Sequence, residues 1–113
     1  MSKKKATEEI VRLIYQLAGI PEGVLTTTSA YRDMVRLRLK RHDICDAIRE
    51  WIDAGKYILE DETRHDPHFT GETIYIIENC PVSEHVLYVK VQIRQNVKTG
   101  NYLLIISAHE PKY

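Results

Sequence analysis

Three stretches in the first half of the chain repeat apolar residues three to four positions apart, the spacing of amphipathic helices. They cover residues 7–18, about 30–38 and about 42–54. The third pattern is the clearest, because its apolar side chains share one helical face: Ile44, Ala47, Ile48, Trp51 and Ile52. The second has an alternative, since the alternation from Val35 to Leu39 also fits a strand.

Residues that favour helix ends flank these stretches. Thr7 can cap the first helix and Gly19 can end it, whereas Ser29 can cap the second. Asp43 lies in the first turn of the third helix, where the helix dipole favours an anion. Gly55 suits the position after the last turn of that helix. The sequence therefore predicts helix boundaries as well as helix faces.

After Gly55 the apolar period changes to two, the spacing of a strand with one buried face. The alternating segments are 56–61, 73–79, 84–95 and 102–109. Cys80–Ser83 breaks the pattern, 62–72 is a polar loop, and 96–101 has the composition of a hairpin loop. A short β-branched run, Val24–Thr28, is a further strand or an extended lead-in.

Helices that precede a run of strands are typical of an α+β domain. Strands this close along the chain must pair antiparallel, because a parallel crossover needs a dozen or more residues. We therefore predict N-terminal helices packed on one face of a mainly four-stranded antiparallel sheet. Since the 113 residues contain no linker, internal repeat or low-complexity tract, we expect a single domain over 1–113.

The strand over 84–95 separates two sets of side chains. Alternation points one set toward the helices: Leu87, Val89, Val91 and Ile93. The other set combines an aromatic ring, an amide and two cations on the opposite face: Tyr88, Lys90, Gln92 and Arg94. Such a row is either a solvated surface or a platform on which bases stack and cations hold phosphates.

Charge and composition narrow the function classes. Sixteen basic residues balance sixteen acidic ones, which counts against strong non-specific attraction to nucleic acid. The charges are unevenly placed, however, because residues 32–41 are basic and residues 60–72 are acidic. No apolar run approaches the length of a membrane span, and no signal peptide is expected. Since Cys45 and Cys80 form no paired motif, we expect a cytoplasmic protein.

Other residues offer candidate chemistry. His109 ends the last strand and can take or give a proton, although a solvated histidine is the alternative. The H-x-x-H of His65 and His68, with Asp66 between them, offers metal ligands. Because no third ligand stands at motif spacing, a polar loop is favoured, and we expect neither a metal nor another cofactor. The two cysteines are more typical of structural than of nucleophilic thiols.

The closing strands resemble the end of MqsR-type toxins, which belong to the RelE-like group of bacterial RNA-cleaving toxins. The similar segments are Tyr88–Val91 and Leu104–Glu110, with Thr26–Ala30 and the Ile44–Trp51 helix upstream. A related bacterial domain family of unknown function is similar over Met34–Ile58 and Ile105–Pro111. The resemblance covers residues 26–111 and implies a RelE/MqsR-like fold.

The resemblance also implies a function. Toxins of this type are metal-independent endoribonucleases that cleave single-stranded mRNA by attack of the ribose 2′-hydroxyl on the neighbouring phosphate. It assigns proton transfer to Tyr88 and to His109, which stands where MqsR-type proteins have a functional lysine. RNA contacts are expected at Lys56, Lys90, Gln92 and Arg94. A cognate antitoxin would restrain the toxin, and a homodimer is a further option.

Two departures from the pattern keep other functions open. The family of unknown function usually has a histidine at the position of Ser29 and an arginine at that of Asp33, and the toxins are typically basic. One alternative is a non-catalytic protein-binding module on the same fold, which docks through the basic and acidic segments. Another is a metal-dependent nuclease or hydrolase that uses His65, Asp66 and His68.

Overall fold

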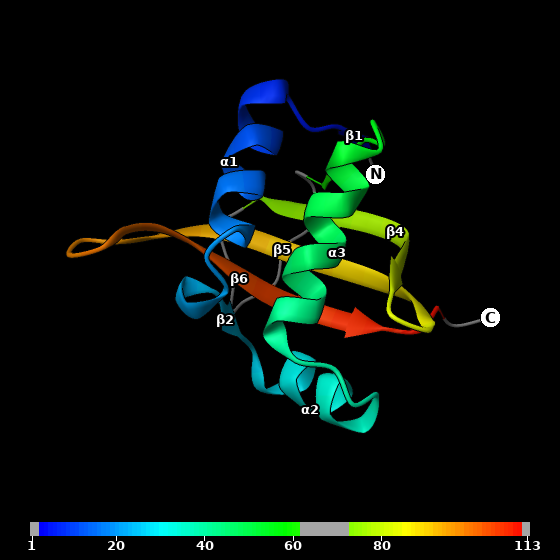
Figure 1. The fold of residues 1–113 in the computed structure, drawn as a ribbon. Coiled ribbons are helices and arrows are strands. Elements are labelled where there is room, and N and C mark those ends of the chain that lie inside the picture. The colour runs from blue at the N-terminus through cyan, green and yellow to red at the C-terminus, as the bar shows by residue number, and fades with distance from the viewer. Residues whose placement is uncertain (1–2, 62–72, 112–113) are drawn as a thin grey trace.

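The computed structural model describes residues 3–61 and 73–111, and within them it places three α-helices against a six-stranded sheet (Figure 1). The helices are α1 (Glu8–Ala18), α2 (Thr28–Arg36) and α3 (Arg41–Asp53), with a short 3₁₀ helix, η1 (Pro21–Gly23), after α1. The strands are β1 (Lys3–Lys5), β2 (Leu25–Thr26), β3 (Leu59–Asp61), β4 (Ile74–Val82), β5 (His85–Asn96) and β6 (Gly100–His109). The predicted α+β class is confirmed.

The expected four-stranded antiparallel sheet is wrong in its strand number and at its edges. The strand order is β1-β3-β4-β5-β6-β2, in which β1 pairs antiparallel with β3 and β2 pairs parallel with β6. Both edge strands pair through backbone groups, which need no apolar alternation in the sequence. β1 consists of three lysines and β2 of two residues, so neither carries the period of two that reveals the longer strands.

The helices cover one face of the sheet, as expected. Figure 1 shows α1 and α3 crossing the same side of the central strands, with α2 beside β6. The predicted inward set on β5 is confirmed, because Leu87, Val89 and Val91 are buried in the same apolar cluster as the helices. From α2 the cluster takes Ala30 and Met34. None of the helices in the described ranges has the length and apolar content to cross a membrane.

Helix caps agree with the sequence except at α2. The Thr7 hydroxyl accepts a hydrogen bond from the Ile10 amide at 3.3 Å, as predicted for the start of α1. Helix α2 is capped by Thr27 rather than by Ser29, and its hydroxyl accepts from the Ala30 amide at 3.1 Å. Thr27 has the extended backbone of an N-cap, whereas Ser29 already lies inside the first turn.

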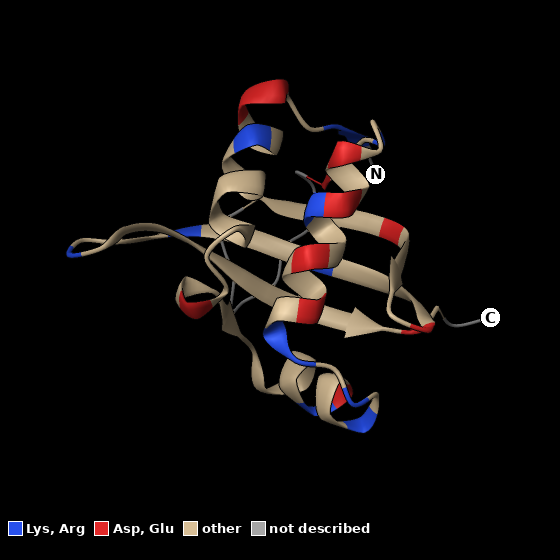
Figure 2. Ribbon diagram, in the orientation of Figure 1, with Lys and Arg blue, Asp and Glu red and all other residues tan. Residues whose placement is uncertain are grey.

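The basic segment 32–41 lies at one end of the molecule, whereas most of the acidic segment 60–72 lies outside the described residues. The basic segment 32–41 forms the second half of α2, the turn after it and the first residue of α3 (Figure 2). Within that turn Arg38 adopts φ 60°, a left-handed conformation that reverses the chain direction between the two helices. Cations of this segment therefore gather around one corner of the fold.

Strand β4 does not end at Cys80, which corrects the predicted break over Cys80–Ser83. The strand continues to Val82, and the chain turns at Ser83, where φ is 57°. A bulge makes this continuation possible. Ile77 pairs with Val89 and Cys80 pairs with Leu87, so two residues of β4 lie opposite one of β5.

A second bulge in β6 decides which way its last residues point. Lys90 pairs with Ser107 and Val91 pairs with Ile105, which leaves Ile106 as the extra residue. Before the bulge Ile105 faces the core, and after it Ala108 does, so the alternation is shifted by one position. The shift turns His109 away from the helices.

Thr27 holds this bulge from the neighbouring edge. Its amide donates to the Ile105 carbonyl at 3.0 Å, and its hydroxyl donates to the Ile106 carbonyl at 2.8 Å. The same hydroxyl caps α2. One side chain therefore ties the start of α2 to the irregular point of β6.

Replacing Thr27 should destabilise the protein more than replacing the residue beside it. We expect Thr27→Ala to lower the free energy of unfolding by about 1–2 kcal/mol, because both hydroxyl hydrogen bonds are lost. Thr28→Ala is the matched control, since the Thr28 side chain is exposed. Urea denaturation measures both, and equal losses in the two variants would contradict the role given to Thr27.

Candidate functional site

Tyr88 and His109 form an aromatic pair on the sheet face opposite the helices. They are direct cross-strand partners on β5 and β6. Their ring centroids lie 5.6 Å apart with 20° between the planes, a stacked arrangement. The pair exists because the β6 bulge brings His109 to the Tyr88 side. The proximity expected of these two residues is thus present.

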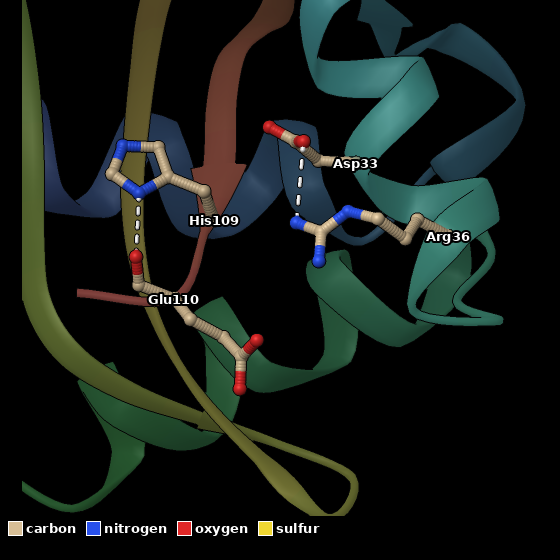
Figure 3. A network of polar contacts seen from close by, with 4 residues as sticks. All are labelled: Asp33, Arg36, His109 and Glu110. Carbon is tan, nitrogen blue, oxygen red and sulfur yellow. Dashed lines mark hydrogen bonds and ion pairs between the residues drawn. The ribbon is translucent and has the colours of Figure 1, made fainter. Parts of the chain in front are cut away.

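The orientation of the His109 imidazole is fixed by a second contact. Nδ1 lies 2.8 Å from the carbonyl oxygen of Glu110, as Figure 3 shows. A carbonyl only accepts hydrogen bonds, so this contact requires Nδ1 to carry the proton. In the neutral ring Nε2 then holds the lone pair. Stacking and this hydrogen bond together present a basic nitrogen in a defined direction.

Helix α2 places an ion pair beside the same end of β6. The Arg36 guanidinium lies 3.5 Å from the Asp33 carboxylate, one turn away on the helix. Figure 3 shows both groups near the C-terminal end of β6, where His109 and Glu110 lie. The pair is exposed and contributes little to stability. It does bring a guanidinium to the neighbourhood of His109.

Lys90 extends the site by one cross-strand row. It pairs with Ser107 on β6, and its Nζ lies 5.4 Å from the centroid of the Tyr88 ring. Alternation places Lys90, Ser107 and the aromatic pair on the same sheet face. The site therefore combines a phenol, an imidazole, an ammonium group and a hydroxyl within two adjacent rows.

Gln92 does not fit the exposed role expected of it. The side chain is fully buried, so the face opposite the helices is not open at its centre. Its cross-strand neighbour is the apolar Leu104, and the Arg94 guanidinium donates to its Oε1 at 3.2 Å. The hydrogen bond occupies Oε1, and burial of the side chain keeps the amide from a ligand. Within the part of the chain that the structure describes, its Nε2 has no hydrogen-bond partner.

Lys56 lies apart from the aromatic pair. Its Nζ is 4.7 Å from the centroid of the Trp51 ring, and the indole Nε1 donates to the Tyr57 carbonyl at 3.0 Å. These residues line a groove of about 430 Å³ that also includes Ile76 and Glu78 of β4. The groove is lined by residues of β3 and β4 and includes neither Tyr88 nor His109.

Glu78 is a candidate that the sequence did not single out. Strand β4 buries Ile77 among the helices, so alternation points its neighbour Glu78 to the opposite side. The β4 bulge sets Glu78 and Asn79 opposite Tyr88, between the Ile77–Val89 and Cys80–Leu87 pairs. Asn79 has a φ of 58°, which marks the irregularity. In the sequence, the feature that could have identified Glu78 is its charge in an otherwise mostly apolar strand segment.

The cysteines are poor candidates for nucleophiles. Burial raises the pKa of Cys45 to about 11, with a further rise from the Asp46 carboxylate. Burial also raises the pKa of Cys80 to about 11, and the nearby Glu50 carboxylate adds to the rise. Both thiols are therefore protonated at neutral pH and shielded from solvent, the condition of structural cysteines.

The metal-binding alternative rests on residues outside the described ranges. His65, Asp66 and His68 all lie there. Among residues 3–61 and 73–111, no group of three or more metal-ligating side chains is close enough to hold an ion. The proton-transferring groups around Tyr88 are consequently the best-defined chemical cluster.

The chain matches no protein-family model, no curated protein and no solved structure. The geometry of the site is therefore the basis for its functional interpretation.

Thiol labelling tests the burial of the cysteines. At pH 8.5 we expect iodoacetamide to alkylate neither thiol of the folded protein rapidly, because the reactive thiolate is disfavoured. Both should react in urea. Ser29→Cys introduces a thiol at an exposed position and is the control that should be labelled quickly. Rapid labelling of the folded wild type, followed by mass spectrometry, would contradict this assignment.

Proposed function

We propose that the protein is an RNA-cleaving toxin of the RelE-like type, acting as a metal-independent endoribonuclease on single-stranded mRNA. The observation that carries the proposal is the Tyr88–His109 pair, stacked at 5.6 Å on the sheet face that the helices leave uncovered. Two groups able to transfer protons stand there beside the ammonium group of Lys90. The resemblance of the closing strands to MqsR-type toxins supports the same function.

The chemistry needs one base and one acid on opposite sides of a phosphate. His109 Nε2 accepts the proton of the ribose 2′-hydroxyl, since the Glu110 carbonyl keeps the proton on Nδ1. The 2′-oxygen then bonds to phosphorus, and the bond to the 5′-oxygen breaks. The Tyr88 hydroxyl donates a proton to that leaving oxygen. The products are a 2′,3′-cyclic phosphate and a 5′-hydroxyl.

The cations of the site take different phosphates. Lys90 lies beside Tyr88 and stabilises the negative charge that develops on the reacting phosphate. Arg94 is six residues beyond Tyr88 along β5, which at the rise of a strand is about 20 Å. It therefore contacts RNA outside the cleaved step. Lys56, in the groove beside Trp51, contacts the RNA on the other side of β4.

Nearby cations partly compensate for two departures from the related proteins, the missing arginine at position 33 and the neutral total charge. The family's arginine at the position of Asp33 is absent, but the Arg36 guanidinium lies 3.5 Å from the Asp33 carboxylate. A cation is thus available at this end of α2. The neutral total charge also conceals the basic corner around 32–41, which can attract RNA locally.

The biological setting belongs to the same proposal. An active toxin requires an antitoxin that blocks it, and mRNA cleavage places it in the cytoplasm. A homodimer remains a further option.

The second candidate function is a non-catalytic protein-binding module on the same fold. Exposed apolar side chains at Leu25, Tyr31 and Val35 favour it, because such groups on a surface mark contacts with other proteins.

Removing the imidazole should abolish both toxicity and cleavage. On induced expression we expect the wild type to arrest growth, and His109→Ala and Tyr88→Phe to relieve the arrest. With a labelled single-stranded RNA and EDTA, His109→Ala should cleave at least about 100-fold more slowly. His42→Ala and Tyr31→Phe are the matched controls, since both residues are exposed elsewhere. A wild type that neither arrests growth nor cleaves RNA would eliminate the ribonuclease.

The charge of Lys90 should act on the chemical step. We expect Lys90→Ala to reduce the single-turnover cleavage rate about 10- to 100-fold, because a developing charge loses its stabilising partner. Lys98→Ala, in the exposed hairpin loop, should leave the rate unchanged. An RNA with a 2′-O-methyl group at the cleaved position should resist the wild type. Cleavage of that RNA at the normal rate would refute attack by the 2′-hydroxyl.

A further inference from the structure

Three of the exposed apolar side chains gather at one groove beside α2. Leu25, Tyr31 and Val35 are 49%, 59% and 57% exposed. Together with Met34 and Leu39 they line a groove of about 530 Å³ between β2, α2 and the turn that follows α2. Apolar groups left in water at adjacent positions are costly and mark surfaces that another molecule covers.

The groove is distinct from the Tyr88–His109 site. Tyr31 and Val35 are four residues apart and share one side of α2. Asp33 projects from the other side of the helix, where Figure 3 shows it near His109. A molecule in the groove therefore contacts the opposite flank of α2 from the one that faces the proposed ribonuclease site.

Two cations border the groove. Lys40 and Arg41 belong to its lining. The Arg41 guanidinium donates to the Val24 carbonyl at 2.7 Å, which fixes that charge next to β2. Arg32 and Arg38 are further exposed cations of α2 and its turn, whereas Arg36 pairs with Asp33 on the other flank of the helix. Residues 32–41 contain a single carboxylate, Asp33, and Figure 2 shows this concentration of Lys and Arg.

The two properties together specify the ligand. Leu25 and Val35 offer exposed aliphatic side chains, and Tyr31 is the single aromatic ring among the groove's lining residues. Single-stranded nucleic acid is usually held by several aromatic platforms on which successive bases stack. The basic rim favours carboxylates over cations by charge complementarity. We propose that this groove binds an acidic, amphipathic segment of a partner protein. Its apolar side chains enter the groove, and its carboxylates face Lys40 and Arg41. The proposal does not depend on ribonuclease activity.

Selection from a library of phage-displayed 12-residue peptides tests the proposal without a known partner. The full-length protein is immobilised, and the enriched peptides are synthesised with a fluorescent label. We expect enriched sequences that combine Asp and Glu with Leu, Ile or Phe. Their affinity, measured by fluorescence anisotropy, should weaken with increasing salt.

Variants place the binding in the groove. Val35→Glu and Lys40→Glu should each weaken the enriched peptides at least tenfold, because one adds a carboxylate to the groove and the other reverses a rim charge. Val97→Glu is the matched control, since Val97 is fully exposed in the β5–β6 hairpin loop. Tyr31→Ala, with its folding checked by urea denaturation, provides an independent test in which no charge changes.

Several outcomes would overturn the proposal. Enrichment of neutral or basic peptides, or no enrichment, removes the acidic partner. Equal binding by Val35→Glu and Val97→Glu places the site elsewhere. A wild-type dimer that Val35→Glu dissociates in sedimentation assigns the groove to a second copy, and loss of RNA binding in Val35→Glu assigns it to nucleic acid. His109→Ala should bind the peptides normally, so failure of the ribonuclease proposal stays distinguishable.

Discussion

The β6 bulge at Ile106 is the constraint on which the candidate site depends. In a regular strand the residues at 103, 105, 107 and 109 would all face the helices, because side chains alternate with a period of two. The extra residue shifts this phase, so Ala108 enters the core and His109 joins Tyr88 on the other face. Thr27 supports the bulge through two backbone carbonyls. The position of His109 in the candidate site thus depends on a bulge that the N-cap residue of α2 contacts.

The sequence predicts those parts of the molecule in which a long pattern repeats. The helical spacing over 42–54 identifies α3, and the alternation along 84–95 separates the buried from the outward side chains of β5. Both follow from the partition of apolar groups away from water, which acts on every residue of the pattern. The proximity of Tyr88 and His109 was also anticipated, though from a resemblance to MqsR-type toxins rather than from periodicity.

Features that depend on one or two residues were missed for physical reasons. Either Thr27 or Ser29 can cap a helix chemically, and in the structure Thr27 has the extended backbone of the cap and also contacts Ile106. The bulges in β4 and β6 each leave one residue unmatched while the strands stay paired, and no residue type predicts them. Gln92 was expected on an open surface because alternation places it opposite the helices, yet that face of the sheet is buried at Gln92. Tertiary context decides each of these positions.

The edges of the sheet have a further consequence. A strand at an edge presents unpaired backbone groups, and another chain can add to it and begin aggregation. Here one edge is the three-residue strand β1, whose Lys4 forms an ion pair with Glu60 of β3 at 3.6 Å, and a very short strand of lysines is a poor template for a further strand. The other edge is β2, which at two residues is too short to template a growing fibril. The unpredicted strand β1 and the short strand β2, which lies within the possible strand Val24–Thr28, thereby protect the sheet from self-addition.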